Sequence, residues 1–535
     1  MRTQAKAQIR PPMITKKKLL PIVVATLLWP VVSNAAIYSF DPGLTPATPS
    51  GGTGAWDTGS AIWSLAGADT VWGNDGTHTA TFGGTAGTVT IGGTTIAANA
   101  LNFNTTGYIV TGGTLNLSGA TPTLTNAASV STTITSLLTG TNGLVLAGGN
   151  GSSSFTINNA ANTFSGGISI NSGILTTNTA GSLGTNVINL NGGTFTPRAN
   201  LTNNLLVTAN STIDMASTGP TFTVGALSIG AQTLSIGTGS NVSNGTVSFG
   251  ATTLTGNAII SNSKGGGTRT DGSATFSTVS VGDSVATGTT TTFTLTSANT
   301  GLTRTRSMSV TGALSDNASD STKKLAFTIN SNVGAPLTVT LSGINTYTGA
   351  TTVNSNASLI VNGSLASGSL VTVNSGALLG GSGTIGGATT FAAGSKLSAG
   401  SNSTATLTFS GGLDISAAAN NTAAFVFTLG TAFDKIVASS LTLGTNVLDA
   451  ADFSLTTGTG FASGQSYTLF ENTSVTGTFT SFAVSNIGGS GIDGTVSLNG
   501  NNIVLTTSAI PEPSTYALLL GAGTALLAGF RRRRS

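Results

Sequence analysis

The sequence predicts an all-β solenoid, and three observations lead to this fold class. Charged residues make up only 7% of the chain, so Glu, Lys and Arg, which favour helices, are scarce. Thr, Ser, Asn, Gly and Val dominate, and these residues favour strands and turns. Short alternating strands bounded by Asn or Gly recur along most of the sequence. Repeated strand–turn units of this size fit a β-solenoid better than a sandwich.

The repeat is clearest in two segments. Residues 162–167 (Asn-Thr-Phe-Ser-Gly-Gly) precede the alternating stretch 168–175, and residues 345–350 (Asn-Thr-Tyr-Thr-Gly-Ala) precede a second such stretch at 351–356. Asn and Gly tolerate left-handed backbone conformations and therefore suit the turns. Alternation places Val, Ile, Leu and Phe inside and Thr, Ser and Asn outside. Weaker copies of the pattern occupy 112–117, 191–195 and 373–378.

The composition argues against disorder and against disulfide bonding. Hydrophobic residues make up 39% of the chain and recur regularly, whereas disordered chains usually lack apolar and β-branched residues. The chain contains no cysteine, so disulfide bonds cannot stabilise it. The repeats must therefore be held together by stacking. At roughly 20–25 residues per rung, we expect residues 36–510 to form about 20 rungs.

The open ends of such a solenoid need caps. Three tryptophans mark residues 36–100 as the N-terminal cap, with a sugar-stacking platform as the alternative interpretation: Trp56, Trp63 and Trp72. Residues 255–335 are expected to form less regular loops or insertions. The predicted organisation is a signal peptide at 1–35, the cap at 36–100, the solenoid at 101–400, a C-terminal β-rich region at 401–510 and a sorting signal at 511–535.

The first 35 residues have the three parts of a secretory signal peptide. Six basic residues precede the apolar run from Leu19 to Val32, and a small-residue cleavage site ends at Ala35. We expect export through the Sec translocon, with cleavage by signal peptidase between Ala35 and Ala36. An uncleaved membrane anchor is the alternative, but Pro21 and Pro30 shorten the helix that it would need.

The last 25 residues also have three parts. Pro511-Glu512-Pro513 is followed by the apolar run 516–530 and then by Arg531, Arg532, Arg533 and Arg534. Arginines resist crossing a bilayer and mark its cytoplasmic side. The apolar run is shorter than the ~20 residues that span a membrane comfortably. We therefore predict one short membrane helix at 516–530 that anchors the chain transiently.

Charge at the two ends hides the character of the body. The predicted pI is 9.2, but residues 36–510 hold nine basic and 15 acidic residues, which leaves them a net charge of −6. The basic pI therefore reflects the two terminal segments. Because the body lacks the basic surface that nucleic acids require, we expect no nucleic-acid partner.

Both motifs resemble known protein classes. The C-terminal segment resembles the PEP-CTERM sorting signal of Gram-negative bacteria, which implies an exosortase-type processing enzyme and delivery to the cell surface or extracellular matrix. The Asn-Thr-(Tyr/Phe)-(Ser/Thr)-Gly units resemble the autotransporter-associated β-strand repeat, which implies a right-handed parallel β-helix like that of autotransporter passengers. Autotransporters carry a membrane β-barrel after the passenger, whereas the sorting tail follows here, so we do not expect self-translocation.

Catalytic chemistry has little support in the sequence. With one histidine and no cysteine, nucleophilic triads are nearly excluded, as are zinc sites. We interpret His78 as a surface turn residue. Acidic residues are spread singly, so no carboxylate pair of the kind that hydrolyses glycosides stands out. We nominate no catalytic, cofactor-binding or metal-binding residue and no cofactor, and we predict that the protein is not an enzyme.

Three shorter motifs have functional counterparts. Residues 381–386 match the dinucleotide pattern G-x-G-x-x-G, but the residues that follow favour a strand instead of the required helix. Residues 488–493 match one calcium-binding nonapeptide, which needs tandem copies. We interpret both as turns. The acidic cluster 316–320 could hold a hard cation loosely, but Lys323 and Lys324 favour a solvated loop.

Three functions follow from these observations. The first is an exported, non-catalytic solenoid that passes through an inner-membrane-tethered intermediate and acts at the cell surface or in the matrix, structurally or as an adhesin, with exopolysaccharide as a candidate partner. The second is ice binding by threonine arrays, although residues 289–292 show abundance and no Thr-x-Thr recurs at a fixed spacing. The third is a polysaccharide-active enzyme, which would need carboxylates gathered on one face.

Overall fold

A computed structural model of the chain describes residues 35–215, 221–238, 245–263, 273–298, 306–400, 404–418, 424–445 and 447–509. The predicted signal peptide up to residue 34 and the sorting signal at 511–535 lie outside these residues. None of the helices in the described part has the length and hydrophobicity that a membrane span needs. Its only helices are two short 3₁₀ turns, η1 (Ala450–Asp452) and η2 (Ile487–Gly489).

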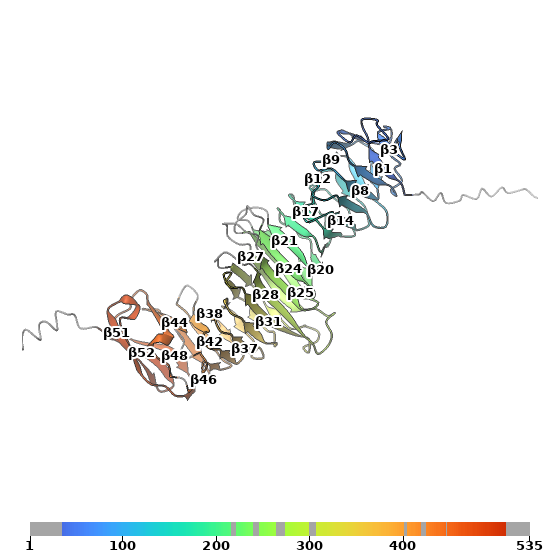
Figure 1. Ribbon diagram of the computed structural model, residues 1–535. Coiled ribbons are helices and arrows are strands. Elements are labelled where there is room, and N and C mark those ends of the chain that lie inside the picture. Colours follow the sequence, from blue (N-terminus) through green and yellow to red (C-terminus); the bar gives the residue numbers. More distant parts are fainter. Residues whose placement is uncertain are drawn as a thin grey trace, which may run out of the picture. The chain divides into compact units, whose positions relative to one another are not determined.

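The strands (Figure 1) form four sheets, of which sheet I spans residues 37–457 and sheet II spans residues 54–477. Sheet I contains β1 (Ile37–Phe40), β3 (Trp63–Leu65), β4 (Ala68–Thr70), β5 (Thr79–Phe82), β8 (Ala100–Phe103), β11 (Thr123–Asn126), β14 (Leu144–Gly148), β16 (Ile168–Ser172), β18 (Ile188–Asn191), β20 (Leu205–Ala209), β22 (Thr221–Thr223), β23 (Leu227–Ile229), β25 (Thr246–Leu254), β27 (Ser273–Val281), β29 (Arg306–Val310), β30 (Leu314–Ser315), β32 (Leu337–Leu341), β35 (Ala357–Val361), β38 (Leu378–Gly381), β41 (Lys396–Ala399), β44 (Phe425–Leu429) and β47 (Phe453–Thr457).

Sheet II faces sheet I across the core. It contains β2 (Gly54–Trp56), β6 (Thr88–Ile91), β9 (Ile109–Gly112), β12 (Ser131–Ile134), β15 (Ser154–Ile157), β17 (Ile174–Thr177), β19 (Thr194–Pro197), β21 (Ser211–Met215), β24 (Thr233–Thr238), β26 (Ala258–Ser263), β28 (Thr290–Ala298), β31 (Lys324–Ser331), β34 (Thr351–Val353), β37 (Val371–Val373), β40 (Thr389–Phe391), β43 (Leu413–Asp414), β46 (Leu441–Gly444) and β49 (Val475–Gly477).

A third side is added by a different sheet near each end of the body. Sheet III contains β7 (Ile96–Ala98), β10 (Thr114–Leu117) and β13 (Leu137–Thr139). Sheet IV contains β33 (Ile344–Asn345), β36 (Ser364–Leu365), β39 (Thr384–Ile385), β42 (Thr406–Phe409), β45 (Lys435–Ala438), β48 (Ser466–Asn472), β50 (Phe482–Val484), β51 (Ile492–Asn499) and β52 (Asn502–Ala509). Strands of sheet III follow sheet II along the chain, whereas the early strands of sheet IV follow sheet I.

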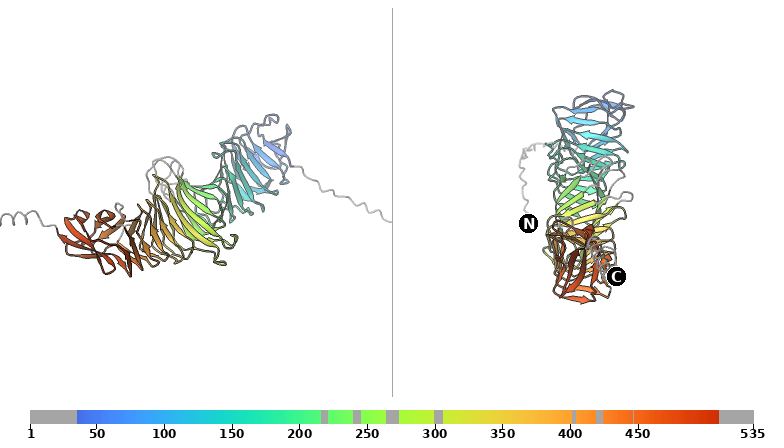
Figure 2. Two further views of the ribbon diagram at one scale, coloured as in Figure 1. Left: turned by 60° about the horizontal axis from the view of Figure 1, so that its bottom comes forward. Right: turned by 90° about the vertical axis from the view of Figure 1, so that its left-hand side faces the viewer.

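Successive rungs pair in parallel, as a solenoid requires. Thr79 of β5 is opposite Ala100 of β8, and the same parallel pairing continues from β8 through β11 to β14. Parallel pairs likewise join β32, β35, β38 and β41 farther along. Figure 2 shows these strands side by side in successive turns. The all-β prediction is confirmed, and the long parallel stacks are those of a β-solenoid.

Antiparallel strands lie at both ends of the stacks. At the N-terminal end β1 pairs antiparallel with β3, and β3 with β4. At the C-terminal end β48, β52, β51 and β50 pair antiparallel in that order. Parallel pairing meanwhile continues across residues 100 and 400, through β5 with β8 and β41 with β44. The domain boundaries placed from sequence therefore remain predictions.

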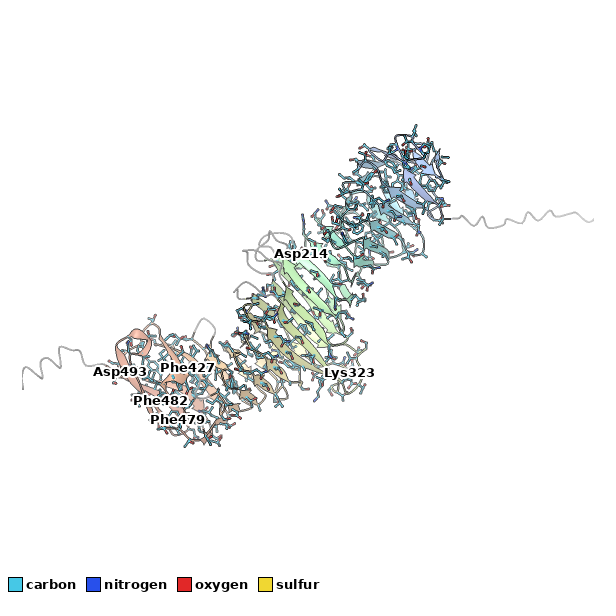
Figure 3. All side chains as sticks on the ribbon, viewed as in Figure 1. Asp214, Lys323, Phe427, Phe479, Phe482 and Asp493 are labelled. Carbon is cyan, nitrogen blue, oxygen red and sulfur yellow. The ribbon has the colours of Figure 1, made fainter. Side chains whose placement is uncertain are left out.

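The middle of the body corrects one expectation. Within 255–335 the described residues include long paired strands where we expected loops or insertions: β27 and β28 each have nine residues, and β28 matches β31 over eight positions. Residues 264–272 and 299–305 lie outside the described residues, and residues 316–323 do form a loop between β30 and β31. The cause of the long strands is the alternation within them, because Phe276, Phe293 and Leu295 are buried while most of the Thr and Ser side chains between buried positions are partly or fully exposed. Lys323, at the turn before β31, is labelled in Figure 3.

A continuous hydrophobic core fills the space between the sheets. Columns of apolar side chains stack from rung to rung, as Phe249 does on Phe276 with ring centroids 5.2 Å apart. Phe276 also meets Phe293 edge-to-face at 5.5 Å. At the C-terminal end Phe479 and Phe482 lie together, 6.1 Å apart (Figure 3). The three tryptophans of the predicted cap are buried in the same core, which excludes a sugar-stacking platform: Trp56, Trp63 and Trp72.

Replacing Phe276 by Ala should lower the free energy of unfolding by about 3–5 kcal/mol, because the cavity cannot close between rungs held by backbone pairing. The exposed Thr278 on the same strand is the matched control, and Thr278→Ala should change stability by no more than about 0.5 kcal/mol. Urea unfolding of both full-length variants measures the difference. Equal losses would contradict the stacked core.

Asp41 anchors the loop after β1 and should make the free energy of unfolding depend on pH. Burial favours its neutral form, but hydrogen bonds from Ser50 and Thr45 outweigh burial and hold the pKa of Asp41 below its ordinary value of 3.8. The ionised carboxylate accepts the backbone N–H of Thr45 at 2.6 Å and that of Ser50 at 2.9 Å. A lowered carboxyl pKa contributes stability above 3.8 that is lost as the pH falls through the folded-state value.

We therefore expect Asp41→Asn to cost about 1–3 kcal/mol at neutral pH. The variant and the natural protein should converge as the pH drops below 3.8. Urea unfolding across a pH series tests this, with Asp69→Asn, at an exposed position, as the control. A gap that stays constant down to strongly acidic pH would show that the Asp41 charge does not matter.

Candidate functional site

The residues singled out in the sequence do not come together into one centre. The prediction that His78 is a surface turn residue was wrong, because its side chain is buried. Its ring centroid lies 5.0 Å from that of Tyr38 and 6.0 Å from that of Trp72. Its Nδ1 accepts the backbone N–H of Ala36 at 3.1 Å, and its Nε2 lies 3.3 Å from the carboxylate of Asp75. His78 thus ties the start of β1 to the cap.

The carboxylates of the acidic cluster 316–320 accept hydrogen bonds from other residues of the protein. The carboxylate of Asp316 accepts the N–H of Leu325 at 2.7 Å and the hydroxyl of Thr348 at 2.7 Å. Hydrogen bonds from Thr322 and Thr287 lower the pKa of Asp320, and Lys323 lowers it further. These carboxylates therefore shape a loop. Among the described residues, no group of three or more His, Asp or Glu side chains could hold a metal ion.

The two glycine motifs occupy turns. Residues 381–386 span the end of β38 and all of β39, and the next element is strand β40, not a helix. Residues 488–493 connect η2 to β51, where Asp493 (Figure 3) accepts the N–H of Asn486 at 2.8 Å. Neither arrangement presents a row of free backbone N–H groups or carboxylates to a ligand.

The outward face of sheet I carries a connected set of uncharged polar side chains, which we name the amide network: Ser169, Asn171, Asn189, Asn191 and Thr208. They come from β16, β18 and β20, three consecutive rungs in parallel register. Alternation places these side chains outward while their neighbours enter the core. This network is not visible in the sequence, because its members are separated by whole rungs.

Each amide in this network is held in a defined orientation. Asn189 Nδ2 donates to Ser169 Oγ at 3.3 Å, and Asn191 Nδ2 donates to Asn171 Oδ1 at 3.0 Å. Ser169 Oγ donates to Asn171 Oδ1 at 2.8 Å. The hydroxyl of Thr208 lies 2.7 Å from Asn189 Oδ1 and 3.0 Å from Asn191 Oδ1. The face is therefore polar, neutral and ordered by its own hydrogen bonds.

A groove of about 360 Å³ runs beside the amide network, and Ser169 and Asn189 belong to both. Val187 and Leu206 contribute apolar surface to its wall and are 44% and 37% exposed. Its volume falls in the range of ~300–1,000 Å³ typical of small-molecule sites. The residues that line it include no charged side chain.

Sheet II presents a second regular polar array on its outward face. Thr294, Thr328, Thr352, Thr372 and Thr390 stand opposite one another on five consecutive strands from β28 to β40. An asparagine ladder runs beside this threonine column: Asn354 donates to Asn330 at 2.6 Å, and Asn374 donates to Asn354 at 2.7 Å.

Comparison with known proteins gives two findings. Residues 509–534 match the PEP-CTERM protein-sorting motif, which confirms the predicted sorting signal. A stretch of 139 residues is 49% identical to the adhesin BmaC autotransporter of Brucella suis biovar 1 (strain 1330), which agrees with the predicted autotransporter-like repeats. The shared stretch covers 25% of this chain and 4% of that adhesin. The sorting motif is one that an exosortase processes, and it points to an exported protein.

Proposed function

We propose that the protein is an exported, non-catalytic β-solenoid that reaches the cell surface or the extracellular matrix and acts there as an adhesive or structural element. The observation that carries this proposal is the sorting motif at 509–534 on a chain whose described part is a parallel solenoid. The similarity to an autotransporter adhesin supports the adhesive role. The same resemblance suggests that the solenoid winds right-handed.

The route to the surface follows from the two terminal segments. The Sec translocon exports the chain, and signal peptidase cleaves between Ala35 and Ala36. The apolar run 516–530 then holds the protein in the inner membrane, with the tail Arg531–Arg534 in the cytoplasm. An exosortase-type enzyme recognises Pro511-Glu512-Pro513 and releases the body.

The uncharged outer surface supports the adhesive role. Threonine, serine and asparagine side chains on the outward faces offer hydrogen bonds without net charge, which suits weak contacts repeated many times along one chain. Such contacts reach useful strength by multivalency and not by one tight site. Exopolysaccharide is the partner that this chemistry fits best.

Replacing Pro511, Glu512 and Pro513 together by Ala should abolish release from the membrane. In an exosortase-positive Gram-negative host, intact mass should show that the natural protein has lost residues 516–535 and lies outside the cell. The variant should keep its tail and stay in the inner-membrane fraction. A host that lacks exosortase is the control. If the natural protein also keeps its tail in the exosortase-positive host, the segment is a plain anchor and the surface function is wrong.

Ice binding is a second candidate, and the threonine column on sheet II is the observation that favours it. The five threonines repeat in register from rung to rung, about 4.8 Å apart. No fixed Thr-x-Thr spacing appears in the sequence, because the rungs differ in length. Regularly spaced hydroxyl and methyl groups of this kind could order water into an ice-like lattice.

On this second function we expect thermal hysteresis from the natural protein and its loss in Thr372→Lys, which places a bulky charge in the middle of the column. Thr278→Lys, on sheet I, is the matched control and should leave the hysteresis intact. Nanolitre osmometry with observation of crystal growth makes the measurement. Absence of hysteresis in the natural protein would eliminate ice binding.

A further inference from the structure

The groove beside the amide network has a floor made of backbone. Gly143, Gly166 and Gly167 line it. A Cβ atom at Gly143 would lie 2.7 Å from the carbonyl oxygen of Gly166 on the next rung, so no side chain fits there. Gly166 and Gly167 also have φ angles of +90° and +91°, which L side chains rarely adopt. The sequence therefore keeps this floor bare.

The walls of the groove combine apolar and amide surface. Val187 and Leu206 expose large parts of their side chains to solvent, although they stand next to hydrogen-bonding groups. Ser169 and Asn189 supply the polar edge. An amide NH₂ has two protons, and within the network Asn189 and Asn191 each use one. The second proton of each remains for an acceptor outside the network.

This combination selects against most classes of ligand. Phosphate, sulfate and carboxylate groups bind most strongly to cationic side chains, and no Lys or Arg lines the groove. A purely apolar ligand would bury the polar edge without replacing its hydrogen bonds. A neutral sugar presents hydroxyl groups at its rim and C–H groups on its faces. Its hydroxyls match the amides and its C–H faces match Val187 and Leu206.

The direction of the groove suits a polymer. Its lining comes from β14, β16, β18 and β20, from the residues just before β14, β16 and β18, and from Ala120 and Thr121 before β11, so it crosses consecutive rungs about 4.8 Å apart. A polymer of sugars in an extended conformation can therefore meet a similar surface at each rung.

We propose that this groove and the adjoining amide network bind an extended, neutral polysaccharide. This inference rests on the proposed function at the cell surface or in the matrix and names the ligand class of one site. The absence of an aromatic platform among the lining residues makes each contact weak, so the affinity depends on several rungs acting together.

Glycan binding by the purified full-length protein in detergent tests the proposal, with cellohexaose and laminarihexaose as neutral probes and polygalacturonate as the anionic one. We expect at least one neutral probe to bind, with an affinity that is equal at low and high salt, because no charge is involved. Asn189→Ala removes an amide, and Val187→Asp places a charge in the groove. Asn189→Ala should weaken binding about tenfold, which corresponds to the loss of one to two hydrogen bonds. Val187→Asp should weaken it to a similar extent, because the C–H face of the sugar would then meet a hydrated charge in place of apolar surface.

Val333→Asp is the matched control, because Val333 is 83% exposed and lies outside the groove. It should bind like the natural protein. Circular dichroism and thermal melting of all variants establish that each one is folded. Equal binding by all three variants, or salt-dependent binding of polygalacturonate alone, would overturn the proposal. So would a change of oligomeric state in Val187→Asp by analytical ultracentrifugation, which would assign the groove to a second copy of the chain.

Failure of this proposal is separate from failure of the proposed function. A protein that is released from the cell but binds neither neutral probe would retain the surface function and lose only this ligand class. A protein that binds the probes through the groove but keeps its tail in the inner membrane would lose the surface function instead.

Discussion

The parallel backbone ladder between successive rungs is the constraint on which everything else in this protein depends. Within the parallel stacks of sheets I and II, a strand finds its hydrogen-bond partners on the rung before and the rung after it, so no rung there can satisfy its own backbone. The ladder also fixes the side chains, because residues in register stack directly on one another. Inward columns become the continuous core, and outward columns become surfaces of nearly uniform chemistry. The antiparallel strands at the two ends limit how much unpaired edge remains exposed.

The same register accounts for the unusual composition. Like charges repeated at the rung spacing would repel by about 1 kcal/mol per pair even in water. Hydroxyls and amides, by contrast, hydrogen-bond to their copies on the next rung, as Asn330, Asn354 and Asn374 do. Where charged residues do occur on the described strands, opposite charges can pair, as Lys435 does with Glu471 of the neighbouring strand at 2.7 Å, or a charge can have uncharged neighbours in register. Asp414, for example, lies between Thr390 and Thr442. A low charge content is therefore what an in-register solenoid of this kind demands.

The fold could be predicted from sequence because alternation and turn residues are local signals, whereas the candidate sites could not, because register is not local. Thr208 reaches Asn191 across 17 residues, Asn374 reaches Asn354 across 20, and Thr275 meets Ser309 across 34. No fixed spacing in the sequence reveals columns built from rungs of such different lengths. The charged residues between 316 and 324 suggested irregular structure throughout 255–335, and residues 316–323 do lie in a loop, but the strands before and after that loop are long and paired. His78 was misjudged because its neighbours in sequence are polar, whereas its neighbours in space are Tyr38 and Trp72.

A surface built this way favours many weak contacts over one strong one. Polar side chains on neighbouring rungs hydrogen-bond to each other, so each asparagine or threonine keeps only part of its hydrogen-bonding capacity for a partner. A ligand that touches one rung gains little, but a polymer that follows the rungs gains the same contact again with little further loss of freedom. The bare glycine floor and the exposed Val187 and Leu206 give this surface one place where a chain can also bury its apolar faces. The attachment to a polymeric matrix that we propose follows from the repeat, because the periodicity that stabilises the fold is also the periodicity that it presents outward.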